Sequence, residues 1–287
     1  MKGAEPILRT DLGALYHGDC MELMPLIPDS SVDLILCDLP YGTVDCKWDK
    51  RIPMGPLWGE YQRIISECGW IVLTAQQPFA TDLINAGRKI FRYQIIWEKN
   101  CALGFLNAKL RPLKAHEILL VFAKKPGVYN PQMTQGDPYR KYHAPGSTPL
   151  YDHCVGAVSE NAGERYPRDV LRFDKDRAQG TGHPTAKPLI LWEWIVKTYT
   201  NPGAVVLDNC VGSGTTACAA EKLGRRWVAM EKEAEYCDIV RRRLAETEEE
   251  IRREEEERAA EARQLKMFDD DGNIKKCLSD KDRQAAG

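Results

Sequence analysis

The stretch AVVLDNCVGSGTTACAAEKLG, residues 204–224, narrows the choice of fold more than any other part of the chain. An apolar run ends at Asp208, a loop with Gly212 and Gly214 follows, and a helical pattern begins near Thr215. Glycines in such a loop let the backbone approach a ligand closely, and the amino end of a helix favours an anionic group. The stretch predicts a buried strand, a tight turn and a helix, which together form a repeating unit of α/β folds.

Short apolar runs alternate with helix-like segments along most of the chain, which predicts an α/β domain with a doubly wound, mostly parallel sheet. The expected strands lie within residues 31–40, 69–76, 91–99, 116–125, 204–208 and 225–230. The expected helices lie within residues 56–68, 189–200, 215–224 and 231–244.

Two regions depart from this alternation. Residues 127–182 are rich in Gly, Pro, Tyr, Arg and His with little periodicity, so we expect an inserted, irregular lobe. Residues 245–287 begin with a polar helical pattern that has few apolar residues to bury, so we expect an exposed helical tail. Residues 1–126 and 183–244 would then be the two halves of one domain.

Composition excludes several classes of protein. Of the 287 residues, 43% are hydrophobic, enough for a large core, but no apolar run approaches the roughly 18 residues that span a bilayer. The first residues lack the apolar core of a secretory signal. The ten cysteines include no Cys-x-x-Cys pair, which is typical of buried thiols in a reducing compartment. We therefore expect a cytoplasmic protein without a membrane partner or a metal site.

The distribution of charge leaves nucleic acid open as a partner. The net charge is −2, but the region from 245 to 271 is strongly acidic, so the preceding body is mildly basic.

Glu231 indicates which kind of ligand the glycine loop would hold. It follows the next apolar run, RRWVAM, and lies 19 residues after Gly212. An acidic residue about 20 positions on, at the end of the neighbouring strand, suits the hydroxyl pair of a ribose. No Gly-Lys-Ser/Thr sequence follows the loop, so the sequence does not predict a phosphate cradle of the Walker type.

Five stretches, taken in order, resemble motifs of the amino-methyltransferases of DNA, which use S-adenosylmethionine. These stretches are YHGDC at 16–20, DLPY at 38–41, HEILLVFAKK at 116–125, HPTAKP at 183–188 and LDNCVGSGTT at 207–216. A catalytic motif that precedes the cofactor loop is the order of the family's beta group, whose recognition region lies between the two. The resemblance implies a Rossmann-like methyltransferase fold with permuted motif order.

The resemblance assigns the chemistry to Asp38, Leu39, Pro40 and Tyr41. An exocyclic amine of a base is a poor nucleophile because its lone pair is delocalised into the ring. The Asp38 carboxylate and the Leu39 carbonyl would accept its two N–H hydrogen bonds and so favour attack on the methyl group. Tyr41 would stack on a base flipped out of the duplex, and Pro40 would stiffen the turn. The family usually has Pro where this chain has Leu39, but the carbonyl remains.

The resemblance also implies which residues hold S-adenosylmethionine. In chain order they are Asp19, Asp38, His183, Thr185, Lys187, Asp208, Cys210, Gly212, Ser213, Gly214, Thr215 and Glu231. Asp19 occupies the position that approaches the adenine of the cofactor.

Double-stranded DNA is the expected substrate, with adenine N6 as the favoured acceptor because the motif begins with Asp. A cytosine-N4 methyltransferase, an RNA base methyltransferase and a non-catalytic DNA- or clamp-binding protein remain alternatives. Methylation of a cytosine carbon is excluded, since the family that performs it uses a nucleophilic cysteine within a Pro-Cys pair, and none exists here.

Basic residues alternate with aromatic ones in the expected lobe, which suits contacts to phosphates and base edges. The candidates for DNA binding are Tyr139, Arg140, Lys141, Tyr142, Arg165 and Arg168. The resemblance adds a setting in restriction-modification, in a bacterial cell or a phage-infected host, and a possible homodimer.

The tail contains QLKMF, which is similar to the peptide by which bacterial DNA enzymes bind the replication sliding clamp. The residues of this hypothesis are Gln264, Leu265, Met267 and Phe268. The alternative is that the apolar members dock on their own domain.

Overall fold

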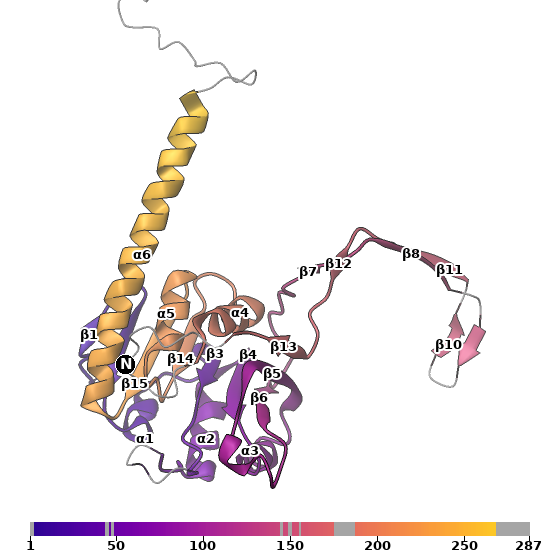
Figure 1. Ribbon diagram of the computed structural model, residues 1–287. Helices are drawn as coiled ribbons and strands as arrows, with labels where there is room; N and C mark the ends of the chain where they lie inside the picture. The colour runs from indigo at the N-terminus through magenta and orange to yellow at the C-terminus, as the bar shows by residue number, and fades with distance from the viewer. Residues whose placement is uncertain are drawn as a thin grey trace, which may run out of the picture.

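Nine strands form one central sheet in the order β1-β2-β15-β14-β3-β4-β6-β5-β13 (Figure 1). The computed structural model describes residues 3–43, 46, 49–143, 146–148, 151–154, 156–174 and 187–267. The strands of the sheet are β1 (Leu8–Arg9), β2 (Gly13–His17), β3 (Val32–Cys37), β4 (Ile65–Ala75), β5 (Phe91–Leu103), β6 (Lys114–Phe122), β13 (Val170–Arg172), β14 (Val205–Asp208) and β15 (Arg226–Glu231).

The sheet is mostly parallel, which confirms the predicted fold class. The four pairings that join β2, β15, β14, β3 and β4 are all parallel, and β13 is parallel to β5. Strand β6 runs antiparallel to both β4 and β5, and β1 is antiparallel to β2. The carboxyl ends of β2, β3, β14 and β15 therefore meet at one edge of the sheet, where open α/β sheets bind their ligands.

Helices cover both faces of this sheet. They are α1 (Cys20–Leu23), α2 (Met54–Ile64), α3 (Phe79–Ala86), α4 (Leu189–Tyr199), α5 (Thr215–Lys222) and α6 (Ala234–Met267), with short 3-10 turns η1 (Met24–Leu26) and η2 (Phe105–Asn107). Each helix buries one apolar stripe, and each buried strand is apolar on both sides, as expected for a covered parallel sheet.

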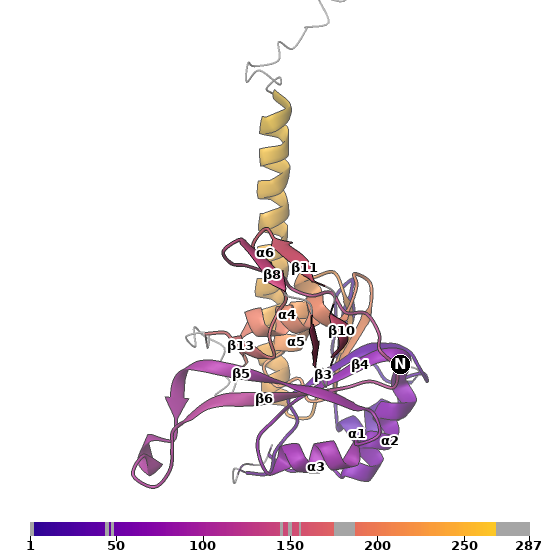
Figure 2. The same ribbon diagram turned by 90° about the vertical axis from the view of Figure 1, so that its right-hand side faces the viewer.

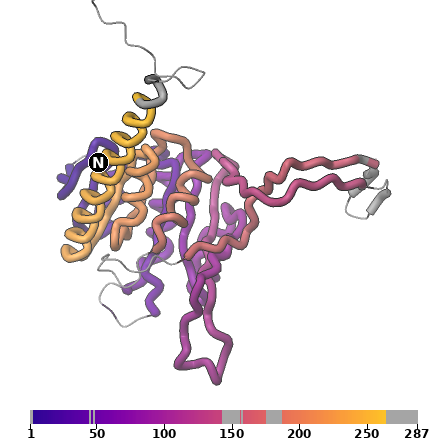
Figure 3. Tube along the Cα trace, turned by 45° about the horizontal axis from the view of Figure 1, so that its top comes forward, coloured from indigo at the N-terminus to yellow at the C-terminus, as the bar shows by residue number. Residues whose placement is uncertain are grey.

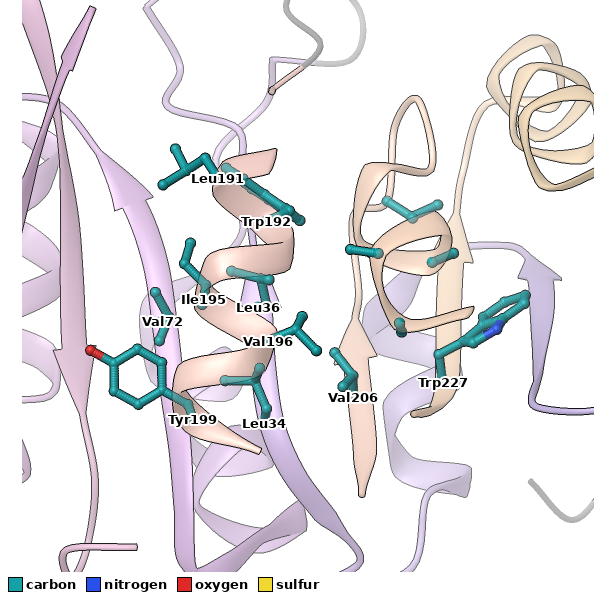
Figure 4. Packing of buried hydrophobic residues seen from close by; sticks show 14 of the residues in the cluster. Leu34, Leu36, Val72, Leu191, Trp192, Ile195, Val196, Tyr199, Val206 and Trp227 are labelled. Carbon is teal, nitrogen blue, oxygen red and sulfur yellow. The ribbon is translucent and has the colours of Figure 1, made fainter. Parts of the chain in front are cut away.

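Figure 4 shows one of the two resulting core layers, in which α4 lies over the middle of the sheet. Trp192 and Val196 of α4 pack with Leu34, Leu36 and Val72 of the strands, and all five side chains are at most 2% exposed. The alternate residues of the same strands point to the other face and pack with α2 and α3. The two layers hold the sheet edge, and hence the loops after the strands, in a fixed geometry.

The boundary between α2 and β4 differs from the prediction of a helix over 56–68. The helix ends at Ile64, and β4 begins at Ile65, which pairs with Val32. Ile64 and Ile65 are both buried, so the first closes the helical stripe and the second opens the strand. A helical apolar period does not distinguish these two roles in the sequence.

The region 127–182 differs from the expected irregular lobe. Three antiparallel pairs, β7 (Thr134–Gln135) with β12 (Glu164–Arg165), β8 (Tyr139–His143) with β11 (Ala157–Asn161) and β9 (Gly146–Thr148) with β10 (Tyr151–Cys154), build a narrow arm that projects from the body (Figures 1 and 3). The chain then returns through β13, which adds a ninth strand to the central sheet.

Helix α6 is one continuous element of 34 residues that passes the expected boundary at 245 (Figure 1). Its first turns bury Val240 and Leu244 against the body, whereas the turns after Thr247 are largely exposed. Exposed ion pairs at helical spacing, such as Arg253 with Glu257, support the projecting part.

The clamp-like peptide is divided by the end of α6. Residues 264–267 belong to the helix, and Phe268 lies outside the described residues. Within the part of the chain that the structure describes, no helix is both long and apolar enough to cross a membrane.

Candidate active site

A cavity of about 900 Å³ opens at the carboxyl edge of the parallel strands. The loops that follow β2, β3, β14 and β15 line it, together with residues of β5, β6 and the start of α4. The predicted catalytic motif and the predicted cofactor loop, far apart in sequence, therefore face one space. Adjacent strands β3 and β14 account for this proximity, because each ends in one of the two motifs.

Asp38 is held by contacts to both of its carboxylate oxygens. Oδ1 accepts hydrogen bonds from the Tyr41 hydroxyl, at 2.9 Å, and from the Thr74 hydroxyl. Oδ2 lies 2.8 Å from the Lys187 ammonium. Thr74 is on β4, next to β3, so the pairing of these strands places its hydroxyl beside the carboxylate. The side chain that the sequence predicts to accept from an amine is thus fixed in one orientation.

A buried network of charges extends from Asp38. Lys187 also lies 3.0 Å from Glu117 Oε2, and Lys99 pairs with Glu117 Oε1. The Lys99 ammonium lies 4.9 Å from the centre of the Trp97 ring. The side chains of Lys187, Glu117 and Lys99 are 11%, 7% and 6% exposed, so water screens these charges little. Two carboxylates and two ammonium groups balance within the network.

The pKa values of this network show which forms it favours. Burial alone would lower the pKa of Lys187, but Asp38 and Glu117 outweigh it and raise that pKa to about 12. Burial alone would raise the pKa of Glu117, but Lys187 and Lys99 together hold it below its usual value. Both groups are therefore charged at neutral pH, and the ammonium of Lys187 lies between two carboxylates.

Tyr41 and Leu39 of the DLPY motif are fixed by packing, and Pro40 between them lines the cavity. The Tyr41 ring lies 5.3 Å from the Phe79 ring at 35°, and burial is the main cause that raises the pKa of its phenol. Leu39 is 3% exposed and belongs to the core beneath α2 and α3. The leucine that replaces the family's usual proline is therefore a core residue, which gives the turn a packing constraint in place of a fixed dihedral angle.

The glycine loop has the conformation that its sequence predicts. Gly212 and Gly214 have φ of 53° and 85°, in the left-handed region that favours glycine. Asp208 is 4% exposed; its Oδ1 accepts from the Cys210 backbone N–H and its Oδ2 from the Thr216 hydroxyl. Burial is the main cause that raises the pKa of Asp208 to about 7. This carboxyl group shapes the turn at the bottom of the cavity.

Glu231, the last residue of β15, connects this strand to the glycine loop through hydrogen bonds. Its Oε2 accepts from the Gly212 backbone N–H at 2.8 Å, and its Oε1 accepts from Lys232 and Glu233 backbone N–H groups at 2.9 Å. Its pKa is raised, mainly by burial. Glu231 also lines the cavity, and its role at a ribose stays a prediction.

Asp19 caps the short helix α1 at the rim of the same cavity. Its Oδ1 accepts from the Met21 N–H at 2.9 Å, and its Oδ2 pairs with Lys232. The hydrogen bond and charge of Lys232 lower the pKa of Asp19. Cys210 also lines the cavity.

Ser213 and Thr215 complete the loop, and a residue that the sequence did not single out holds both. Arg243 of α6 donates to the Ser213 carbonyl at 2.6 Å and to the hydroxyls of Ser213 and Thr215 at 3.0 Å. The sequence also gave no prediction for Thr74, Lys99 and Glu117. For Glu117 a signal existed, because a single carboxylate preceding the apolar run of β6 is exceptional in a buried strand.

The predicted DNA-contacting residues are not brought to the cavity. Tyr139, Arg140, Lys141, Tyr142 and Arg165 belong to strands of the arm, and Arg168 follows it. The arm begins beyond Phe122, which pairs with Ile71 near the amino-terminal side of the sheet, opposite the cavity. Its DNA-binding role stays a prediction.

Two predicted cofactor residues, His183 and Thr185, lie outside the described residues. Among the residues that are described, no group of three or more His, Cys, Asp or Glu side chains is arranged to hold a metal ion.

Comparison with known proteins identifies the family. The model of the DNA methylase family, N6_N4_Mtase, matches residues 32–242, and the chain belongs to this family of amino-methyltransferases. The chain is 29% identical over 253 residues to the type II methyltransferase M.BglII from Bacillus subtilis, covering 79% of this chain and 68% of the relative. It is 28% identical over 262 residues to the DNA adenine methyltransferase YhdJ from Escherichia coli K12, covering 84% and 86%.

Solved structures share the fold. The cytosine-N4-specific PvuII DNA methyltransferase superposes with a TM-score of 0.64 at 17% identity, covering 84% of this chain and 89% of that one. The M1.HpyAVI–SAM complex superposes with a TM-score of 0.57 at 23% identity, covering 81% and 99%. Both likenesses agree with the predicted Rossmann-like methyltransferase fold.

Proposed function

We propose that this chain transfers a methyl group from S-adenosylmethionine to the exocyclic amine of a flipped base in duplex DNA, with adenine N6 as the acceptor. One observation carries the proposal: Asp38 and the Gly212–Gly214 loop open into the same cavity. A site that joins a cofactor loop to a fixed amine acceptor suits a two-substrate transfer, because proximity replaces a bimolecular encounter.

The residues present fit the methyl donor. Gly212 lines the cavity just before the amino end of α5, and the carboxylates of Asp19 and Glu231 lie at the same cavity. The glycine loop would hold the donor, with Glu231 at its ribose and Asp19 towards its adenine. When bound, S-adenosylmethionine supplies an electrophilic methyl group on sulfur. The family membership and the relatives' cofactor support this assignment.

Asp38 has the central chemical role in the proposal. Its carboxylate accepts an N–H of the target amine, while the Leu39 carbonyl accepts the second, so that the nitrogen lone pair is available for attack. As the nitrogen–carbon bond forms and the carbon–sulfur bond breaks, positive charge would develop on the nitrogen, and the Asp38 carboxylate would stabilise it. Loss of one amine proton to solvent would then leave the neutral methylated amine. Tyr41 and Thr74 hold the carboxylate in place through Oδ1.

Adenine is the proposed base for two reasons. The motif begins with Asp38, which resembles the adenine enzymes, and YhdJ is named as a DNA adenine methyltransferase. Cytosine N4 is the second candidate, because the PvuII enzyme, which is cytosine-N4-specific, shares the fold. The name of M.BglII as a type II methyltransferase supports a setting in restriction-modification.

Nucleoside mass spectrometry tests the proposal. Unmethylated duplex DNA and a structured RNA are incubated separately with the full chain and S-adenosylmethionine, then digested and analysed. N6-methyladenine in the DNA is the expected product. N4-methylcytosine would keep the chemistry and replace the base, and methylation of RNA alone would replace the substrate. Cofactor binding without any methylated base would favour a non-catalytic DNA- or clamp-binding protein.

A further inference from the structure

The β5–β6 hairpin carries the most exposed large apolar side chains of the described residues. Leu106 and Leu110 are each 84% exposed and Phe105 is 76% exposed, more than any other exposed large hydrophobic residue in the described part. Leu103 and Leu113, at the base of the same tip, are 46% and 45% exposed. An exposed apolar cluster of this kind marks an interaction site.

The hairpin stands on the same side of the sheet as the cavity. Strand β4 ends at Ala75, opposite Ile118, and beyond that pair only β5 and β6, with the short edge strand β13, continue the ladder. Figures 2 and 3 show the hairpin extending past the body, in a direction different from that of the arm. Lys99 and Leu103, on β5, line the cavity itself. The tip is therefore an extension of the cavity wall.

The charge of the tip indicates what it meets. Residues 99–116 contain four basic side chains and no acidic one. Lys99 is used by the buried network, but Lys109 and Arg111 are exposed and form no ion pair within the described residues. A surface that combines apolar side chains with unpaired cations is complementary to duplex DNA, which offers phosphates beside stacked bases.

We propose that the hairpin tip, residues 103–113, is a contact surface for duplex DNA that acts beside the target base. Phe105, Leu106 and Leu110 enter the base stack or the groove next to the base that is flipped, and Lys109 and Arg111 contact phosphates. This inference rests on the proposed function, since it places the DNA over the cavity that holds Asp38. In this proposal the apolar residues of the hairpin, and not those of the arm, separate the stacked bases of the DNA.

The test measures binding of the full chain to a fluorescent mixed-sequence duplex at several salt concentrations. The apolar variant is Phe105→Ala/Leu106→Ala/Leu110→Ala, and its control is Leu26→Ala on η1, where an exposed leucine precedes the amino end of β3. We expect the apolar variant to bind about tenfold more weakly with an unchanged salt slope. The control should bind like the wild type.

The charge variant separates phosphate contacts from apolar ones. Lys109→Ala/Arg111→Ala should lower the slope of log affinity against log salt by about two, since each phosphate contact contributes about 0.9. Arg88→Ala/Lys89→Ala is the matched control, because these exposed residues precede the amino end of β5, at the other side of the sheet. Its slope should equal that of the wild type.

Two further readouts make the outcome decisive. Cofactor affinity, measured by calorimetry, should be unchanged in both hairpin variants, which shows that they are folded. If wild-type protein methylates DNA but both hairpin variants bind the duplex like the controls, the hairpin inference is overturned and the proposed function stands. If the apolar variant instead turns a dimer into a monomer with unchanged DNA affinity, the tip joins two copies of the chain and the inference is again overturned. Failure of the wild type to bind duplex DNA overturns both.

Discussion

The Lys187 ammonium lies 2.8 Å from Asp38 Oδ2 and 3.0 Å from Glu117 Oε2, so that one buried cation joins the carboxylate of the DLPY motif to a second carboxylate. The resemblance of the HPTAKP motif assigns Lys187 to the cofactor-binding residues, and Lys187 does line the cavity. Its contacts lead us to propose in addition that Lys187 positions Asp38 and that Glu117 positions Lys187 in turn.

Replacement of Lys187 by Met should reduce kcat by about a hundredfold, on the scale of losing one preorganised electrostatic group. The two carboxylates would then share no cation, and Asp38 would lose the contact that fixes Oδ2. The dissociation constant for S-adenosylmethionine should change little. The control is Lys197→Met, which removes an exposed ion pair with Glu193 within α4. An equal loss in kcat and in cofactor affinity would instead support the motif-based assignment.

The Glu117→Gln variant should change how stability depends on acid. The lysines hold the pKa of Glu117 below its usual value, so the ionised form stabilises the fold at pH values above that usual value. This contribution is lost as the pH falls through the folded-state pKa. Thermal melts from pH 7 to pH 3.5 should therefore show a shallower acid decline for the variant than for the wild type. Parallel declines would contradict the charged network.

The raised pKa of Asp208 predicts that stability changes with pH in the opposite direction. Burial raises its pKa to about 7 from 3.8, so between these values the folded state keeps a proton that the unfolded state has lost. Its contribution to stability therefore falls as the pH rises through this window. Asp208→Asn should gain stability relative to the wild type between pH 5 and pH 7, measured by calorimetry without cofactor. Asp238→Asn, an exposed aspartate on α6, should show no such gain.

The Leu39→Ala variant tests whether the leucine at this position of the motif serves the packing of the core and not the chemistry. Leu39→Ala should lower the free energy of unfolding by about 2–5 kcal/mol, because the side chain is buried. The backbone carbonyl remains, so kcat well below the melting temperature should stay within a few fold of the wild type. A folded variant with no turnover would show that the leucine side chain itself is needed for the chemistry.

Arg243 should matter for the cofactor and not for the base. Its guanidinium joins the Ser213 carbonyl to two loop hydroxyls, so Arg243→Met should weaken S-adenosylmethionine binding by about tenfold. Arg252→Met, in the exposed part of the same helix, is the matched control. Unchanged affinity in Arg243→Met would mean that the loop keeps its shape without this contact.

The parts that could be predicted are those encoded by local patterns. The strand before Asp38 and the strand before the Gly212 loop are continuous apolar runs that end in polar residues, and adjacent parallel strands bring such ends together. The expectation of a ligand site at this edge of a mostly parallel sheet follows from the same patterns.

The parts that could not be predicted depend on contacts between distant segments. Glu117 and Lys187 are 70 residues apart, and no local period shows that they share a charge network. Strand β13 is only three residues long and owes its existence to its pairing with β5. The β5–β6 hairpin is long because these two strands continue to pair beyond the end of β4. A short apolar pattern in the sequence does not reveal this length.

The most direct test of the proposed role of Asp38 measures two quantities on the same Asp38→Ala protein, with the wild type alongside. These are the affinity for S-adenosylmethionine and the yield of methylated nucleoside from unmethylated duplex DNA. We expect N6-methyladenine from the wild type and none from the variant, with cofactor binding retained within a few fold. Undiminished methylation by Asp38→Ala would contradict the role of this carboxylate and, with it, the proposed transfer at this site.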